Sequence, residues 1–163
     1  MKKISFIIFA LLLVGKCYSQ SGEWASVLYS YSKGPVSPEY QYNYTVWIDE
    51  TGSGKLTYTK SASTNTYEFT VSKEGLDKLN NALMKSQVFV ISEDSLKGER
   101  THIGGPEKSL LINRLQYAVQ GSIPATIEIP IPVNEKYSDS INELYETIDG
   151  LVPSDVWDLA RAQ

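Results

Sequence analysis

The strongest constraint on the fold is an alternation of apolar and polar residues that begins at Tyr40. It runs over residues 40–48, resumes over residues 55–59 after a polar turn at residues 49–54, and appears a third time over residues 66–71. Period-two alternation rich in aromatic and β-branched residues is typical of strands that bury one face only. The pattern predicts a meander of three strands whose apolar face must be covered by other parts of the chain.

Further strands are indicated on both sides of this meander. Residues 24–32 alternate in a similar way, except that Leu28 breaks the pattern, and a loop with two prolines separates them from the meander. Alternation returns over residues 110–119, and a turn at residues 120–122 allows a hairpin into residues 127–131. Residues 88–91 are predicted to form either a short buried strand or an extended plug.

Two main helices are predicted to cover the apolar face. The first spans residues 73–86, with Ser72 as its N-cap, and carries an apolar stripe. The second spans residues 138–151, where Ser140 and Glu143 have the spacing of a capping box. A short helix follows Pro153. The fold class predicted is therefore α+β: an antiparallel sheet with two main helices packed on one face and a short C-terminal helix, in a single domain over residues 20–163.

The first 19 residues have the pattern of a secretory signal peptide. Met1-Lys2-Lys3 is basic, and an apolar run from residue 4 to residue 14 is too short for a spanning helix. We expect a periplasmic or secreted protein that begins at Gln20. The alternative is a lipoprotein anchored through Cys17, although Lys16 stands where a lipidation signal has a small residue. No later run is long enough to make the mature protein integral to a membrane.

Removal of this leader makes the chain more acidic. It takes three of the 15 basic residues and leaves 12 against 19 acidic residues, a net charge of −7. This balance argues against nucleic acid and anionic membrane surfaces as partners. The one cysteine lies in the leader, so the mature domain has no disulfide, and no pattern indicates a cofactor.

Two local patterns are candidates for sites of chemistry. Thr51-Gly52-Ser53-Gly54-Lys55 has a superficial likeness to a phosphate loop, but strands flank it and the motif's other residues are missing, so a hairpin turn is predicted. His102 is the only histidine of the chain. Zinc sites and catalytic triads need His together with other ligands or a nucleophile at set spacings, so no metal site and no catalytic residue are predicted.

A candidate interaction surface comes from one loop and one strand residue. The loop over residues 99–106 combines Arg100 and His102 with Gly104 and Gly105, and loops carry function more often than cores. The alternative is that Gly104, Gly105 and the following proline only direct the chain into the next strand. Trp47 has the outward parity of its strand, which indicates either a binding role or packing at an edge.

A set of packing positions gives a likeness to known proteins. These positions lie in the strands, at the start of the first helix and before a later strand: Pro38, Tyr40, Tyr42, Tyr44, Val46, Ile48, Gly54, Leu56, Tyr58, Phe69, Val71, Ser72, Leu76, Leu79, Ile103, Gly104, Gly105 and Pro106. With them the chain resembles a loose group of small exported bacterial α+β domains of unknown function. Gln20 at the new N-terminus also resembles leaders of the Bacteroidetes group. The resemblance implies a fold and a compartment, and no catalytic residue.

Two classes of function remain. The favoured hypothesis is an exported non-catalytic module that binds a protein or glycan partner at the bacterial cell envelope. The alternative is a hydrolase of envelope polymers that uses paired carboxylates. A pocket with two carboxylates about 5–10 Å apart would favour the hydrolase, whereas a flat polar sheet face without one would favour the binding module.

Overall fold

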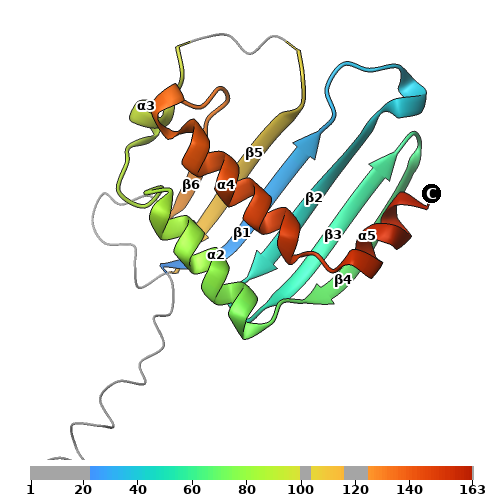
Figure 1. The fold of residues 1–163 in the computed structure, drawn as a ribbon, viewed down its shortest axis with the longest axis horizontal. Coiled ribbons are helices and arrows are strands. Elements are labelled where there is room, and N and C mark those ends of the chain that lie inside the picture. Colours follow the sequence, from blue (N-terminus) through green and yellow to red (C-terminus); the bar gives the residue numbers. More distant parts are fainter. Residues whose placement is uncertain (1–22, 100–103, 116–124, 163) are drawn as a thin grey trace, which may run out of the picture.

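The computed structural model describes residues 23–99, 104–115 and 125–162 and shows an α+β fold (Figure 1). Its sheet has six antiparallel strands in the order β4-β3-β2-β1-β5-β6. The strands are β1 (Trp24–Ser32), β2 (Tyr42–Asp49), β3 (Ser53–Lys60), β4 (Ser63–Thr70), β5 (Glu107–Arg114) and β6 (Thr126–Ile129). The first strand in the chain therefore lies inside the sheet, between β2 and β5.

Two long helices pack together across one face of the sheet, as predicted (Figure 1). They are α2 (Lys73–Lys85) and α4 (Glu135–Leu151). The shorter elements are the 3-10 helix η1 (Pro38–Tyr40), α3 (Glu93–Leu96) near β6, and α5 (Ser154–Arg161) against β4. None of the helices that the structure describes is long and apolar enough to cross a membrane.

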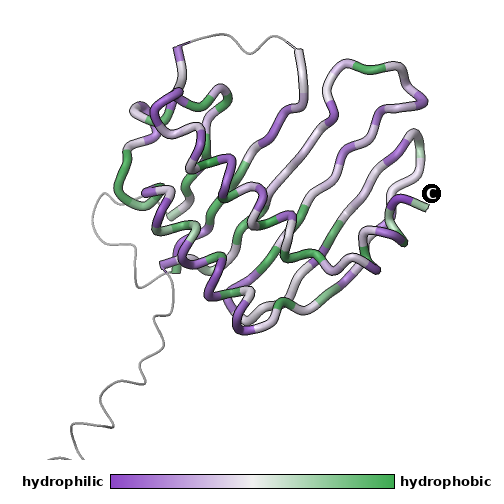
Figure 2. Tube along the Cα trace, viewed as in Figure 1, coloured by the Kyte–Doolittle hydropathy of each residue, from purple (hydrophilic) through white to green (hydrophobic). Residues whose placement is uncertain are grey.

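The core lies between the sheet and these helices. Buried residues alternate with more exposed ones along β2, β3 and β6, as the sequence pattern predicted. Figure 2 shows green segments interspersed with white and purple ones in the sheet. The buried strand residues are Trp24, Val27, Tyr29, Tyr44, Val46, Ile48, Leu56, Tyr58, Leu110, Ile112, Ile127 and Ile129. The opposing helix residues include Leu79 and Leu83 of α2 and Ile141, Leu144 and Ile148 of α4. The shared parity of the strands thus produces one continuous apolar layer.

The start of α4 differs from the prediction. The helix begins at Glu135, and Asn134 is its N-cap, because its side-chain oxygen accepts from the backbone N–H of Lys136 at 3.1 Å. Ser140 lies inside the helix, and its hydroxyl donates to the carbonyl of Tyr137 at 2.9 Å. The predicted capping box was therefore wrong. A serine in a helix can bond the preceding turn instead of capping. Ser72, by contrast, caps α2 as predicted and accepts from Gly75 N.

Residues 88–91 form neither a strand nor an extended plug. They lie in a turn in which the N–H groups of Val90 and Ile91 donate to the carbonyl of Gln87, each at 3.0 Å. Val88 is buried while Val90 is 82% exposed. Because the hydrogen bonds are helical, the side chains of Val88 and Val90 point to different sides.

The hairpin turn predicted at Thr51–Lys55 is confirmed by the antiparallel pairing of β2 with β3. The predicted turn at residues 120–122 and strand residues 116–119 lie outside the described residues.

Candidate binding face

The side of the sheet opposite α2 and α4 is here called the open face. Its residues alternate with the buried ones, and none of those that the structure describes on this face is buried. In strand order from β6 to β4 the central row is Glu128, Leu111, Leu28, Trp47, Lys55 and Glu68. Trp47 therefore has the outward orientation predicted for it. Trp47, Leu28 and Leu111 form the apolar centre of this row, and polar residues form the neighbouring rows.

Toward the connection between β1 and β2, the next two rows of the open face are polar. Ser109, Ser30 and Thr45 form the first row. Glu107, Ser32 and Asn43 form the second. These six residues line a hollow of about 320 Å³, together with Tyr31, Tyr44 and Ile131, which follows β6. The hollow begins one row from Trp47, so hydroxyl and amide groups lie next to a partly exposed indole.

Other polar groups on the open face bond to each other. The hydroxyls of Thr57 and Thr66 lie 3.0 Å apart, as do those of Thr59 and Thr64. In the hollow the pattern changes. Over the described ranges of the chain, the side chains of Ser30, Thr45 and Ser109 bond to no other residue. Each hydroxyl can donate one hydrogen bond and accept two, so these groups are open to water or to a ligand.

The predicted interaction surface divides into separate parts. Gly104 and Gly105 have positive φ values of 73° and 83°, as their residue type permits. They lie beyond the start of β5, at least four residues, or roughly 13 Å, along the strands from the row of Trp47. Arg100 and His102 lie outside the described residues, so their role stays a prediction. The hollow lies between Trp47 and the two glycines.

The two glycines also lie against the loop after β1. A Cβ atom built on Gly34 would lie 2.0 Å from the carbonyl oxygen of Gly105. Only a glycine fits such an approach, and Gly34 itself has a φ of 86°. The loop before β5 and the loop after β1 are thus in direct backbone contact at the rim of the hollow.

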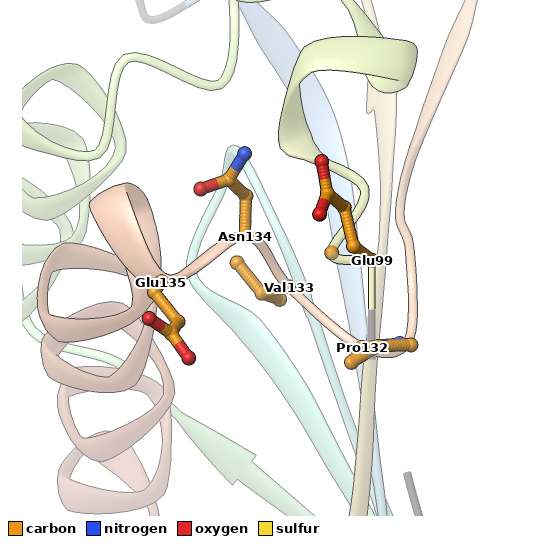
Figure 3. A pocket seen from close by; sticks show the side chains of 6 residues that line it. Glu99, Pro132, Val133, Asn134 and Glu135 are labelled. Atoms are coloured by element: carbon orange, nitrogen blue, oxygen red, sulfur yellow. The ribbon is translucent and has the colours of Figure 1, made fainter. Parts of the chain in front are cut away.

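A second pocket, of about 250 Å³, contains two carboxylates (Figure 3). It forms where the segment after α3 meets the segment before α4, joined by the bond from Gly98 N to the carbonyl of Pro132 at 2.8 Å. Glu99 and Glu135 line it, and both are exposed. In Figure 3 their carboxylates point in different directions. Of the described residues that line the hollow on the open face, one is charged, namely Glu107.

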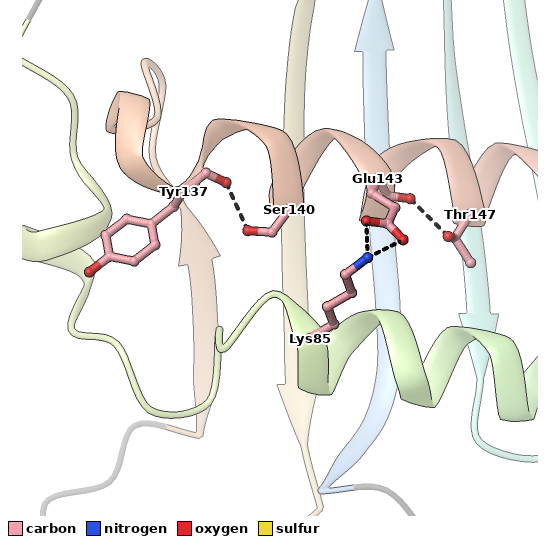
Figure 4. A network of polar contacts seen from close by, with 5 residues as sticks. All are labelled: Lys85, Tyr137, Ser140, Glu143 and Thr147. Carbon is pink, nitrogen blue, oxygen red and sulfur yellow. Dashed lines mark hydrogen bonds and ion pairs between the residues drawn. The ribbon is translucent and has the colours of Figure 1, made fainter.

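A third concavity, of about 680 Å³, runs between α2 and α4. Two of its charged residues pair with each other: Lys85 donates to both carboxylate oxygens of Glu143 at 2.7 and 2.6 Å (Figure 4). The hydroxyl of Thr147 donates to the backbone carbonyl of Glu143 at 2.8 Å. Among the described residues, no group of three or more His, Cys, Asp or Glu side chains could hold a metal ion.

One carboxyl group has an environment unlike the others. Burial raises the pKa of Asp149 above its usual value, against the opposing effects of the Tyr44 hydroxyl, Lys108 and Arg161. The Tyr44 hydroxyl donates to both carboxylate oxygens, at 2.9 and 3.0 Å. Asp149 lines none of the three concavities described above. Its position between β2 and α5 is that of a packing residue.

The sequence predicted the outward orientation of Trp47 but not the hollow beside it. The alternation in the sequence does place Ser30 and Thr45 on the outward-facing side of their strands. This was the only signal in the sequence that pointed to the hollow. Ser109 lies in a stretch without clear periodicity, and its place beside Ser30 depends on the pairing of β1 with β5. No protein-family model matches the chain, and no curated protein matches its sequence.

Proposed function

We propose that the protein is an exported, non-catalytic module that binds a glycan at the bacterial cell envelope through its open face. The observation that carries this proposal is the hollow beside Trp47, in which the hydroxyls of Ser30, Thr45 and Ser109 bond to no other described residue. Export is inferred from the leader sequence alone.

The chemistry of the open face suits a saccharide. Sugars present hydroxyl groups that both donate and accept hydrogen bonds, as do Ser30, Thr45 and Ser109. Sugars also present apolar C–H faces that pack on aromatic rings, and Trp47 offers a large, partly exposed ring between Leu28 and Lys55. A protein partner remains the other occupant, and the experiment below distinguishes it.

The hydrolase alternative has weaker support. It would use Glu99 and Glu135, the two carboxylates of one pocket. Both are exposed, and they point in different directions (Figure 3). A general acid is usually a carboxyl group in a shielded environment, which these two residues lack.

The proposal is tested by calorimetric titration with soluble oligosaccharides released from the cell envelope. Trp47→Ala should weaken binding about tenfold, which corresponds to about 1.4 kcal/mol. Ser30→Ala with Ser109→Ala should weaken it too, because both hydroxyls line the hollow. The control is Thr57→Ala with Thr66→Ala, on the same face, where the hydroxyls bond each other. It should change binding less than twofold.

Two results would overturn the glycan proposal. One is the absence of saccharide binding together with an envelope protein whose capture depends on Trp47, which would identify a protein partner. The other is saccharide binding that Trp47→Ala leaves intact, which would move the site away from the open face.

A further inference from the structure

Four tyrosines form an array on the helix side of the sheet, here called the tyrosine quartet: Tyr31, Tyr42, Tyr44 and Tyr58. Their rings are nearly parallel. Centroids lie 4.9 Å apart for Tyr31 and Tyr44, 5.8 Å for Tyr31 and Tyr42, and 5.6 Å for Tyr42 and Tyr58. The interplanar angles of these three pairs are 15°, 21° and 16°. Stacked in this way, the rings direct their edges, which carry partial positive charge, away from one another.

The quartet lies at the end of the sheet that the long helices leave uncovered. In Figure 1, α4 crosses the strands diagonally, and no described helix crosses β1 and β2 where they approach their connection. Tyr44 and Tyr58 are buried, while Tyr31 and Tyr42 are partly exposed. Trp157 of α5 borders the quartet, with its ring edge-on to Tyr44 at 4.9 Å. The result is a partly open aromatic surface beside α5.

Three cations surround this surface. The Lys33 Nζ lies 5.2 Å from the centre of the Tyr42 ring. Lys108 pairs with Tyr31 across the strands, and its Nζ lies 5.7 Å from the Tyr145 ring. Arg161 lies 4.8 Å from the Trp157 ring. Aromatic rings hold all three, and none forms an ion pair with a carboxylate in the described parts of the chain.

No carboxylate of the described residues is seen to form an ion pair with these cations. Asp149 interacts electrostatically with Lys108 and Arg161. Its carboxylate accepts a hydrogen bond from the Tyr44 hydroxyl. Glu107 is next to Lys108 in sequence and lies on the open face, because neighbouring residues of a strand point to opposite sides. Three cations thus lie around the quartet, with Asp149 and Glu146 as the acidic groups that share their electrostatic environment, in a chain whose mature form is predicted to carry a net charge of −7.

We infer that the tyrosine quartet and its three cations form a second binding site, which takes the carboxylate or sulfate groups of an acidic polysaccharide. Arg161 and the two lysines supply charge-assisted hydrogen bonds to the oxyanions. The phenol hydroxyls add donors, and the ring edges favour negative charge. The quartet side chains point to the opposite side of the sheet from Trp47. Tyr31 and Tyr44 also line the hollow, but the recognition of charge inferred here does not depend on the proposed role of the open face.

Affinity chromatography on immobilised polymers tests this inference. Four probes are compared: polygalacturonate, dextran sulfate, uncharged dextran and single-stranded DNA. The protein should be retained on polygalacturonate or dextran sulfate, and the preferred polymer shows whether carboxylate or sulfate is the group recognised. Dextran should not retain it, and DNA should retain it at least tenfold less strongly. Equal retention on DNA would show simple ion exchange and would overturn the inference.

A charge-matched pair of triple variants locates the site. Lys33→Gln, Lys108→Gln and Arg161→Gln together should reduce affinity for the acidic polysaccharide at least tenfold. The control variant removes the same amount of charge elsewhere, from α2, the end of α3 and α4, by Lys73→Gln, Lys97→Gln and Lys136→Gln. Its affinity for the acidic polysaccharide should fall less than twofold. Tyr42→Phe, which keeps the ring and removes the hydroxyl, should reduce it severalfold. Equal losses in the two triple variants, or retention on none of the charged polymers, would overturn the inference.

Discussion

The hydroxyl of Tyr44 donates to both carboxylate oxygens of Asp149, at 2.9 and 3.0 Å, and so links β2 to α4 across 105 residues of sequence. Trp157 adds a second link, because its indole N–H donates to the backbone carbonyl of Asp149 at 3.3 Å. Together these bonds fix the end of α4 and the start of α5 over the sheet.

Tyr44→Phe should destabilise the protein by about 1–3 kcal/mol, because it leaves a partly buried carboxylate without its donor. Chemical denaturation gives the free energy of unfolding. Tyr58→Phe is the control: its ring is also buried, but its hydroxyl has no hydrogen bond to a described residue, so the expected loss is below about 0.5 kcal/mol. Equal effects of the two changes would show that the bond to Asp149 contributes little.

The stability should also depend on pH through Asp149. Its pKa is raised in the folded state, chiefly by burial, above the usual value of 3.8. Between 3.8 and the raised value the folded state binds more protons than the unfolded state, so the free energy of unfolding falls as pH rises through this interval. Asp149→Asn removes this contribution. The difference in unfolding free energy, wild type minus variant, should therefore decrease with rising pH there and be constant at neutral pH. A difference that increases would contradict the assignment.

The corrected start of α4 gives a third prediction. Asn134→Ala should destabilise the protein by about 1 kcal/mol, because it removes the oxygen that accepts from Lys136 N. Ser140→Ala should change stability by less than about 0.5 kcal/mol, since its hydroxyl bonds within the preceding turn. Thermal or chemical unfolding of the two variants shows which of the two residues caps the helix. A larger loss for Ser140→Ala would restore the capping box that the sequence suggested.

Two glycines with open space around them should respond in opposite directions. Gly104 has a φ of 73° and no atom within 4 Å of a built Cβ, so Gly104→Val should cost about 1–3 kcal/mol from backbone strain alone. Gly150 lies in α4, also with no atom within 4 Å, and Gly150→Ala should stabilise the protein by about 0.5–1 kcal/mol. Unfolding curves check both. A neutral Gly104→Val would show that the loop adopts another conformation at no cost.

Arg100 and His102 are tested by a double alanine variant. Surface substitutions usually change stability by less than about 0.5 kcal/mol, and we expect this of the pair. If Arg100 anchors a partner, binding should weaken by about 1 kcal/mol or more. The measurement is a titration with whichever partner the open face binds. A stable variant with unchanged binding would leave Gly104 and Gly105 as a connection into β5, and an unstable variant would give the loop a structural role.

The sequence predicted most of the fold because the relevant signals are local. Alternation assigns Tyr29 and Val46 to the buried face and Trp47 to the open face, whatever strands they pair with. The hollow could not be predicted in this way, since Ser30, Thr45 and Ser109 meet through the pairing of three strands. The bond from Tyr44 to Asp149 depends on the angle at which α4 crosses the sheet. At the start of α4, asparagine and serine are both common N-cap residues, so residue type alone does not separate Asn134 from Ser140.

The central place of β1 has a consequence for how the domain can be divided. Without β1 the sheet separates into a β2–β4 meander and a β5–β6 pair, which share no strand pairing. A chain that starts after Ser32 should therefore stay incomplete until a peptide of residues 24–32 is added and inserts between the two pieces. That insertion restores the neighbours of Tyr29 and Val27 and joins β5 to β2. The fold thus offers a natural split-protein pair in which a nine-residue tag reconstitutes the domain.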